Sequence, residues 1–174
     1  MSLFLKMIYG SLTGAWGGLA AWALLDRVLQ VEPANPYLDA LLNGAVIGIC
    51  VGALMGGFVG VVEGSWRRSL RGLAGGLATG FLGGALGLLV GEALFQGFAQ
   101  RMWVRATGWA FFGITVGAGE GLLIRSWRRV LFGAAGGLLG GVAGSLAFMA
   151  VKSTLTLPAF GRALGFTILG ALLG

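Results

Sequence analysis

Six long apolar runs account for most of this chain, and short polar segments separate them. The first five each supply about 20 residues, which is the length that a helix needs to cross the hydrocarbon core of a bilayer. The sixth run is shorter. The pattern therefore predicts an all-α, polytopic membrane protein with six transmembrane helices, roughly at 8–28, 37–62, 67–97, 102–123, 127–151 and 158–174.

The polar segments predict where the chain turns. Pro33 and Pro36, together with neighbouring charges, mark a loop between the first and second runs. The tetrapeptide Ser-Trp-Arg-Arg begins at Ser65 and again at Ser126, and it predicts the second-to-third and fourth-to-fifth connections. The first run lacks a clear small-residue cleavage site of the kind that ends a signal peptide, so we expect the first helix to be retained.

One passage occurs twice in the chain, at a constant spacing of 61 residues. At least twelve identities at one spacing indicate an internal duplication of a glycine-rich helical hairpin. The first copy contains Gly52, Gly56, Gly60, Ser65, Trp66, Arg67, Arg68, Gly72, Gly75, Gly76, Gly80 and Gly83. The second contains Gly113, Gly117, Gly121, Ser126, Trp127, Arg128, Arg129, Gly133, Gly136, Gly137, Gly141 and Gly144.

The repeat extends to both ends of the sequence. The first run matches the third at a spacing of 62 residues, through Gly10, Gly14 and Gly18. The sixth run matches the fourth at a spacing of 57 residues, through Arg162, Ala163, Gly165, Gly170 and Gly174. The chain is therefore one transmembrane domain over 1–174, with repeat units at about 37–97 and 102–151 and partial units at 8–28 and 158–174.

Two consequences follow from this order of repeats. A two-helix unit returns to the side of the membrane where it began, so the repeats are parallel and related by an axis along the membrane normal. In addition, Gly174 corresponds to Gly117, which lies in the middle of the fourth predicted helix. We therefore expect the natural polypeptide to continue beyond residue 174.

Composition agrees with a lipid environment. Only 10% of the residues are charged, 57% are apolar and the mean hydropathy is +0.90, whereas soluble domains carry about 25% charged residues. Glycine provides 35 of the 174 residues. Most of these glycines are spaced by three or four positions, which places them on one helix face, and small residues on such a face allow two helix backbones to approach closely in a membrane.

The glycine faces are the strongest candidate site, and we assign them to helix packing. Packing within one chain or between subunits is the simpler interpretation, and a groove that lines a pore or a lipid site is the alternative. The packing residues are Gly52, Gly56, Gly60, Gly72, Gly76, Gly80, Gly113, Gly117, Gly133, Gly137 and Gly141.

Arginines cluster at the two Ser-Trp-Arg-Arg turns. With six spans, these turns and both termini share one side, which holds seven cations against five on the other side. Excess positive charge marks the cytoplasmic side. The clusters set the topology, and as an alternative they bind anionic lipid head groups. Their members are Arg67, Arg68, Arg71, Arg125, Arg128 and Arg129.

The acidic residues nearest these clusters are Glu63 and Glu120, and we predict that they form interfacial ion pairs with the arginines, because an unpaired charge in hydrocarbon is costly. A proton or cation site is the alternative. The two acids are out of register in the repeat, since Glu120 corresponds to Val59. For the polar residues inside apolar runs, hydrogen bonds between helices are the simpler expectation. These residues are Asn43, Thr79 and Glu92.

Several kinds of site are excluded or disfavoured by residue content. The chain has no histidine and a single cysteine, Cys50, so we expect no metal, no cofactor and no catalytic residue. The glycine runs lack the Gly-Lys-Ser or Gly-Lys-Thr of a phosphate-binding loop. The basic residues lie at helix ends, which disfavours nucleic-acid binding.

The run from Gly117 to Arg129, followed by Gly133, Gly136, Gly137, Gly140 and Gly141, resembles the glycine-rich repeated membrane region of certain bacterial proteins. In that family a forkhead-associated or similar signalling domain follows the membrane part. The resemblance implies a bacterial inner-membrane location and a role in holding a cytoplasmic domain. The glycine-zipper proteins of mitochondrial protein import are similar only superficially, because this chain repeats an arginine turn that they are not known to share.

The sequence therefore predicts a non-enzymatic scaffold or anchor subunit in the bacterial cytoplasmic membrane, with both termini in the cytoplasm. Its partners would be membrane lipids and either other membrane subunits or further copies of itself, and not nucleic acid. A channel or small-solute transporter with parallel two-helix repeats is the alternative, although the second to fifth helices offer few polar residues to line a path. The sequence does not identify a partner, a solute or an oligomeric state.

Overall fold

The computed structural model describes residues 3–29, 35–62, 64–98, 102–123, 126–154 and 158–173, and these residues are almost entirely helical. The α-helices are α1 (Leu3–Ala23), α2 (Pro36–Val62), α3 (Trp66–Gly97), α4 (Met102–Leu123), α5 (Trp127–Thr154) and α6 (Pro158–Leu173). The all-α class and the order of the predicted helices are confirmed, and the bounds of α2 to α6 differ from the predicted ones by three residues at most.

The first helix differs most from its prediction. It begins at Leu3, because a lysine at position 6 extends a helix without interrupting it. At its other end the chain passes into a π-helix, η1 (Leu24–Leu29), which contains Asp26 and Arg27. Such i→i+5 turns are rare and are frequently found at functional sites, and nothing in the apolar pattern distinguishes them from ordinary helix.

Three helices within the described part of the chain are long and apolar enough to cross a membrane. They are α2, α3 and the Trp127–Ala150 part of α5, whose most apolar stretches have mean hydropathies of 2.4, 1.8 and 1.7. Helix α6 contributes a shorter apolar stretch, Phe160–Leu173.

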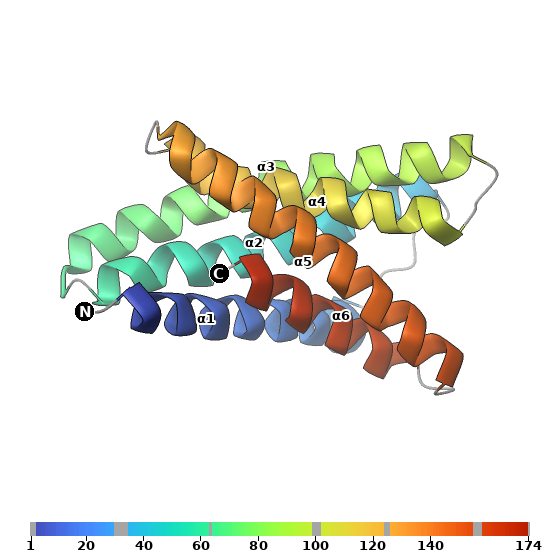
Figure 1. The fold of residues 1–174 in the computed structure, drawn as a ribbon, viewed down its shortest axis with the longest axis horizontal. Helices are drawn as coiled ribbons and strands as arrows, with labels where there is room; N and C mark the ends of the chain where they lie inside the picture. The colour runs from blue at the N-terminus through green and yellow to red at the C-terminus, as the bar shows by residue number, and fades with distance from the viewer. Residues whose placement is uncertain are drawn as a thin grey trace.

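The helices lie lengthwise beside one another (Figure 1), and their contacts close the six into a ring. Each helix packs against the next one in the chain, and α6 packs against both α5 and α1. Neighbours run antiparallel, so the N-terminal end of α1 lies at the same end of the molecule as the α2–α3 and α4–α5 connections. The two partial repeats predicted at 8–28 and 158–174 therefore lie side by side, as α1 and α6.

The centre of the ring is filled mainly from α2, α4 and α6. Val51, Phe112 and Leu169 are almost fully buried, at 0%, 1% and 0% exposure. These residues are separated by the same spacings of 61 and 57 that relate the repeats. One turn along, Met55, Val116 and Leu173 hold equivalent positions and pack in the same cluster. The core thus consists of layers that take one side chain from each repeat.

The α2–α3 connection is a Schellman turn, a helix ending in which a residue of left-handed conformation satisfies the last carbonyl groups. Gly64 has a φ of +65°, a conformation that glycine adopts without strain. Its N–H donates to the Val61 carbonyl at 3.0 Å, and the Ser65 N–H donates to the Gly60 carbonyl at 3.0 Å. The Ser126 N–H makes the equivalent bond to the Gly121 carbonyl, also at 3.0 Å, so the duplicated sequence produces the same backbone bond.

Candidate functional site

Helices α2 and α3 lie against each other along a row of paired glycines. A methyl carbon added to either member of a pair would overlap the carbonyl oxygen of the other, so the two backbones are in direct contact. The pairs are Gly44 with Gly84, Gly48 with Gly80, Gly52 with Gly76 and Gly56 with Gly72. Beyond them Gly60 meets the backbone of Ser69.

Helices α4 and α5 repeat this arrangement in the same register. Gly113 faces Gly137 and Gly117 faces Gly133, which are the α2–α3 pairs Gly52–Gly76 and Gly56–Gly72 moved by 61 positions. At the ends of the row, Gly141 faces the Trp109 carbonyl and Gly121 faces the backbone of Val130. The spacing of the duplication therefore specifies both the glycine positions and their partners.

Helices α6 and α1 form a third pair of the same kind, although they lie at opposite ends of the sequence. Gly170 faces Gly14, and Gly18 faces the Phe166 carbonyl. The equivalent positions in α4 and α5 are found by subtracting 57 from the α6 positions and adding 123 to the α1 positions. Gly170 with Gly14 then corresponds to Gly113 with Gly137, and Phe166 with Gly18 corresponds to Trp109 with Gly141. The ring is thus three helix pairs in equivalent register, and the third pair is divided between the two ends of the sequence.

All eleven glycines assigned to packing from the sequence lie in these contacts. Packing within one chain and packing between subunits were both open on the sequence, and the structure places these glycines between helices of one chain. Glycine contacts also join the neighbouring pairs, since Gly91 of α3 lies against Gly108 of α4 and Gly144 of α5 faces Gly165 of α6.

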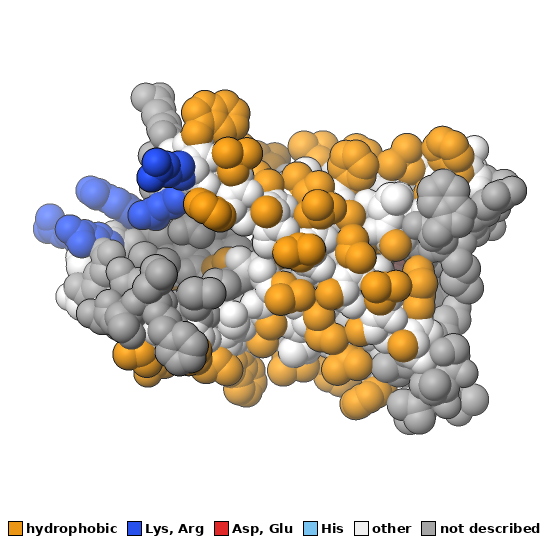
Figure 2. All heavy atoms as spheres, viewed as in Figure 1, with side chains coloured by type: hydrophobic (Ala, Val, Ile, Leu, Met, Phe, Trp, Pro, Cys, Tyr) orange, Lys and Arg blue, Asp and Glu red, His pale blue; other side chains and the backbone are white. Residues whose placement is uncertain are grey.

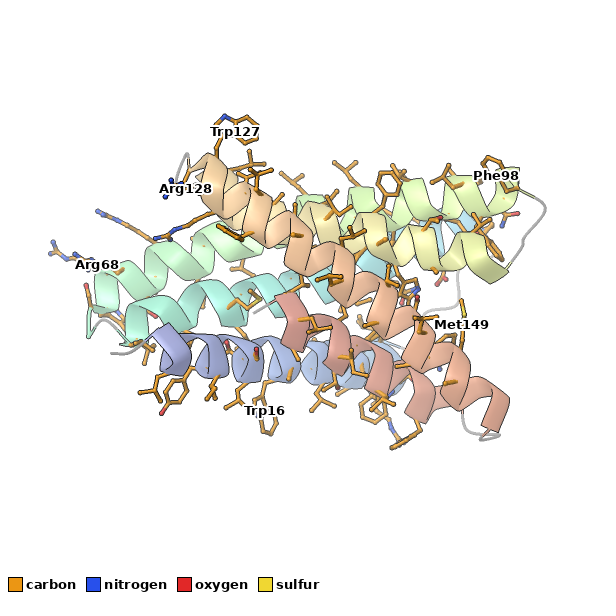
Figure 3. The ribbon with its side chains drawn as sticks, viewed as in Figure 1. Trp16, Arg68, Phe98, Trp127, Arg128 and Met149 are labelled. Atoms are coloured by element: carbon orange, nitrogen blue, oxygen red, sulfur yellow. The ribbon has the colours of Figure 1, made fainter. Side chains whose placement is uncertain are left out.

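The arginines of the two turns lie at one end of the ring (Figures 2 and 3). Arg67, Arg68, Arg71, Arg128 and Arg129 are all exposed. Trp66 and Trp127 flank them at 75% and 76% exposure. Arg125 lies outside the described residues. Indole side chains at the ends of membrane helices favour the interface between lipid and water. The exposed positions of Trp66 and Trp127 agree with that preference.

The predicted ion pairs of the two acids stay predictions. Glu63 lies outside the described residues, and the side chain of Glu120 is also outside them. The hydrogen bonds seen for the other polar candidates are within single helices. Asn43 donates to the Asp39 carboxylate at 2.8 Å, Thr79 donates to the Gly75 carbonyl at 2.9 Å, and Glu92 accepts from Gln96 at 2.7 Å.

Bonds between helices come from residues that the sequence reading did not single out. The Ser69 hydroxyl donates to the Gly57 carbonyl at 2.7 Å, and the Thr115 hydroxyl donates to the Gly83 carbonyl at 2.6 Å. Both hydroxyls interrupt apolar, glycine-rich helices, where Ser and Thr are known to bond across an interface. The sequence shows both hydroxyl residues inside apolar runs, but it does not show which neighbouring helix each of them faces.

A polar cluster at the opposite end from the arginines joins η1 to α6. Arg162 forms an ion pair with Asp26 at 2.9 Å, and Asp26 also accepts a hydrogen bond from the Trp22 indole at 3.1 Å. The Arg27 guanidinium lies 5.8 Å from the centre of the Trp22 ring, within reach of a cation–π contact. The cluster therefore links the end of α1, through η1, to α6, the helix pair whose members are not consecutive in the chain.

Two cavities lie on opposite sides of the Val51–Phe112–Leu169 layer. The larger, about 650 Å³, is at the arginine end, and its lining includes Met55, Thr79, Val116, Leu173 and many of the paired glycines, with Arg68, Arg71 and Arg129. The smaller, about 200 Å³, is at the other end, and its lining includes Asp39, Asn43, Glu92, Trp109 and Arg162.

The described residues contain no group of three His, Cys, Asp or Glu side chains that could hold a metal ion. Comparison of the chain with protein-family models, with curated proteins and with solved structures finds no match.

Proposed function

We propose that this chain is a non-enzymatic integral membrane scaffold or anchor subunit, with all six helices crossing the bacterial cytoplasmic membrane. The observation that carries the proposal is the distribution of residue sizes. Glycine backbones meet at the contacts between paired helices, whereas many large apolar side chains are exposed. Leu82, Leu131, Phe132 and Leu139 are 57%, 65%, 77% and 65% exposed.

Such a surface suits lipid. Hydrophobic side chains cover the middle of the face seen in Figure 2, and the blue Lys and Arg side chains gather at one end. Soluble monomers rarely expose contiguous apolar patches larger than about 300–600 Å². The arginine end would face the cytoplasm, since positive charge favours that side. Because the glycine faces are occupied within the chain, further subunits would contact the outer apolar face or the arginine end.

Membrane integration is tested by extraction of isolated membranes with alkaline carbonate. We expect the chain to remain in the membrane pellet, as proteins do when their helices are embedded in hydrocarbon. Release of the chain into the supernatant in a folded form would contradict the proposal. A soluble fusion partner expressed alone provides the control for trapping in vesicles.

A channel or small-solute transporter is the second candidate, and the two cavities are the observation that favours it. They open from opposite ends of one ring and are separated by a single layer of side chains. In liposomes, a scaffold gives no ion or solute flux. Flux that is abolished by Glu120→Gln, and increased by Phe112→Ala at the central layer, would favour the second candidate.

A further inference from the structure

The larger cavity lies where the helix pairs separate at the arginine end. Contacts between α3 and α4 run from Gly91 against Gly108 to Thr79 against Gly119. Beyond Thr79 toward the arginines, the cavity occupies the space between the α2–α3 pair and the α4–α5 pair. Of the described residues of α6, Leu173 lines this cavity.

The cavity is apolar inside and basic at its mouth. Its lining consists of Met55, Val116, Phe132, Leu173, Thr79 and glycines, together with Arg68, Arg71 and Arg129, which are exposed. The one hydroxyl in the lining, from Thr79, donates to its own helix. No buried side-chain nitrogen or oxygen in the described part of the chain lacks a partner. An occupant therefore needs an apolar body and an anionic end.

The depth of the cavity matches one leaflet of a bilayer. Arg68 and Thr79 both line it and are eleven residues apart on α3, which corresponds to about 16 Å along the helix. The hydrocarbon core of a bilayer is about 30 Å thick, so this depth is about half of it. The volume of about 650 Å³ is within the range of about 300–1,000 Å³ typical of ligand pockets.

We infer that this cavity binds one acyl chain of an anionic phospholipid from the leaflet at the arginine end, with the phosphate of the head group on Arg68, Arg71 and Arg129. The inference rests on the proposed membrane location. Charge complementarity selects the lipid, because basic pockets between membrane helices bind anionic head groups. Bound lipid would then fill the space between the two helix pairs, and membrane lipid composition would influence the stability of the ring.

The repeat supplies matched variants to test the head-group contact. Arg68 and Arg129 are equivalent in the two repeats and line the cavity, whereas Arg67 and Arg128 are also equivalent but do not line it. The two double variants R68Q/R129Q and R67Q/R128Q remove the same charge at the same end. Bound lipid is measured by native mass spectrometry of detergent-purified protein, with phosphatidylglycerol or phosphatidylcholine of identical acyl chains.

We expect the parent and R67Q/R128Q to retain phosphatidylglycerol in preference to phosphatidylcholine, and R68Q/R129Q to lose that preference by about tenfold, since each arginine near a head group contributes appreciably to anionic lipid binding. Equal loss in both double variants would indicate diffuse attraction by surface charge and would overturn the inference. Parent protein without any preference, while alkaline extraction leaves it in the membrane, would overturn the inference and leave the proposed location intact.

The acyl chain needs a separate test. Met55→Trp adds bulk inside the cavity, and we expect it to reduce bound phosphatidylglycerol about as much as R68Q/R129Q does. Should that variant fail to fold, the parent protein is photolabelled with phosphatidylglycerol that carries a diazirine in the middle of its acyl chain. Labelling of Met55, Thr79 or Val116 supports the inference. Labelling confined to outward residues such as Leu82 and Leu86, or co-purification of a peptide helix in place of lipid, would contradict it.

Discussion

Glycine is unfavourable inside a helix in water, by about 1 kcal/mol relative to alanine, yet this chain places it at every contact that defines the helix pairs. The close approach explains why. Backbones in direct contact gain dispersion energy and weak Cα–H···O contacts, and a single methyl group would force them apart. The same residue type has no such role at Gly97, where an added carbon meets nothing within 4 Å.

This difference gives a matched substitution. Gly76→Ala adds a methyl group that collides with the Gly52 carbonyl, and we expect it to lower the free energy of unfolding by about 1–3 kcal/mol, as overpacking of a close-packed interior does. Gly137→Ala should act alike, because it is the equivalent position and faces Gly113. Gly97→Ala is the control and should leave stability unchanged or raise it by up to about 1 kcal/mol.

The measurement for these variants is unfolding in detergent, followed by circular dichroism at increasing fractions of denaturing surfactant. Equal midpoints for Gly76→Ala and Gly97→Ala would show that the close glycine contacts do not stabilise the ring.

At the residue scale, sequence reasoning identified the packing glycines because their spacing of three and four positions is visible without a structure. It could not assign partners to the polar residues. Asn43, Thr79 and Glu92 were expected to bond between helices and instead bond within their own helices, whereas Ser69 and Thr115 make the bonds between helices. Which face of a helix meets which neighbour depends on helix rotation, and the apolar pattern is too uniform here to define it.

At the scale of elements, the structural unit is a pair of helices whose glycines face each other. In two of the pairs the helices are consecutive in the chain and are connected at a Ser-Trp-Arg-Arg turn. The third pair consists of α6 and α1. The repeat order indicated that the first and last helices were halves of one unit. It could not show that the halves meet, because repeats of this kind also pair between subunits. Ring closure is therefore a result of the structure.

The divided pair predicts that the chain tolerates circular permutation. In the permutant, Gly174 is joined to Leu3 through a copy of residues 118–125. Because Gly174 corresponds to Gly117 and Leu3 to Ser126, this join reproduces the α4–α5 connection. New termini are placed in the segment between η1 and α2. We expect this permutant to retain the helix content and detergent stability of the parent, because all three helix pairs keep their glycine contacts.

The matched control carries the same join but opens the chain between Gly64 and Ser65, which destroys the Schellman turn of the α2–α3 pair. We expect that version to be less stable, since it loses the bonds that end α2. Gel filtration and circular dichroism in detergent distinguish the two outcomes. Aggregation of the first permutant, with the parent folded, would contradict the equivalence of the three pairs.

At the scale of the whole molecule, the ring combines glycine contacts between neighbouring helices with many exposed large apolar side chains, and this combination supports the proposed membrane location. Three helices of the described chain have the length and hydropathy to span a bilayer, and the proposed six-span arrangement would extend that property to the whole ring. The larger cavity could not be predicted from sequence, because it depends on how far the helix pairs separate near the arginines.

The six-span arrangement is the central claim. It is tested most directly in intact spheroplasts, with variants that each carry one cysteine in a Cys50→Ala background. Ser65→Cys and Ser126→Cys mark the arginine end, and Asn35→Cys and Phe98→Cys mark the opposite end, as the positions of Phe98 and Arg68 in Figure 3 show. We predict that a membrane-impermeant thiol reagent labels positions 35 and 98 in intact spheroplasts, and labels positions 65 and 126 only after permeabilisation. Labelling of all four positions from the same side would contradict the claim.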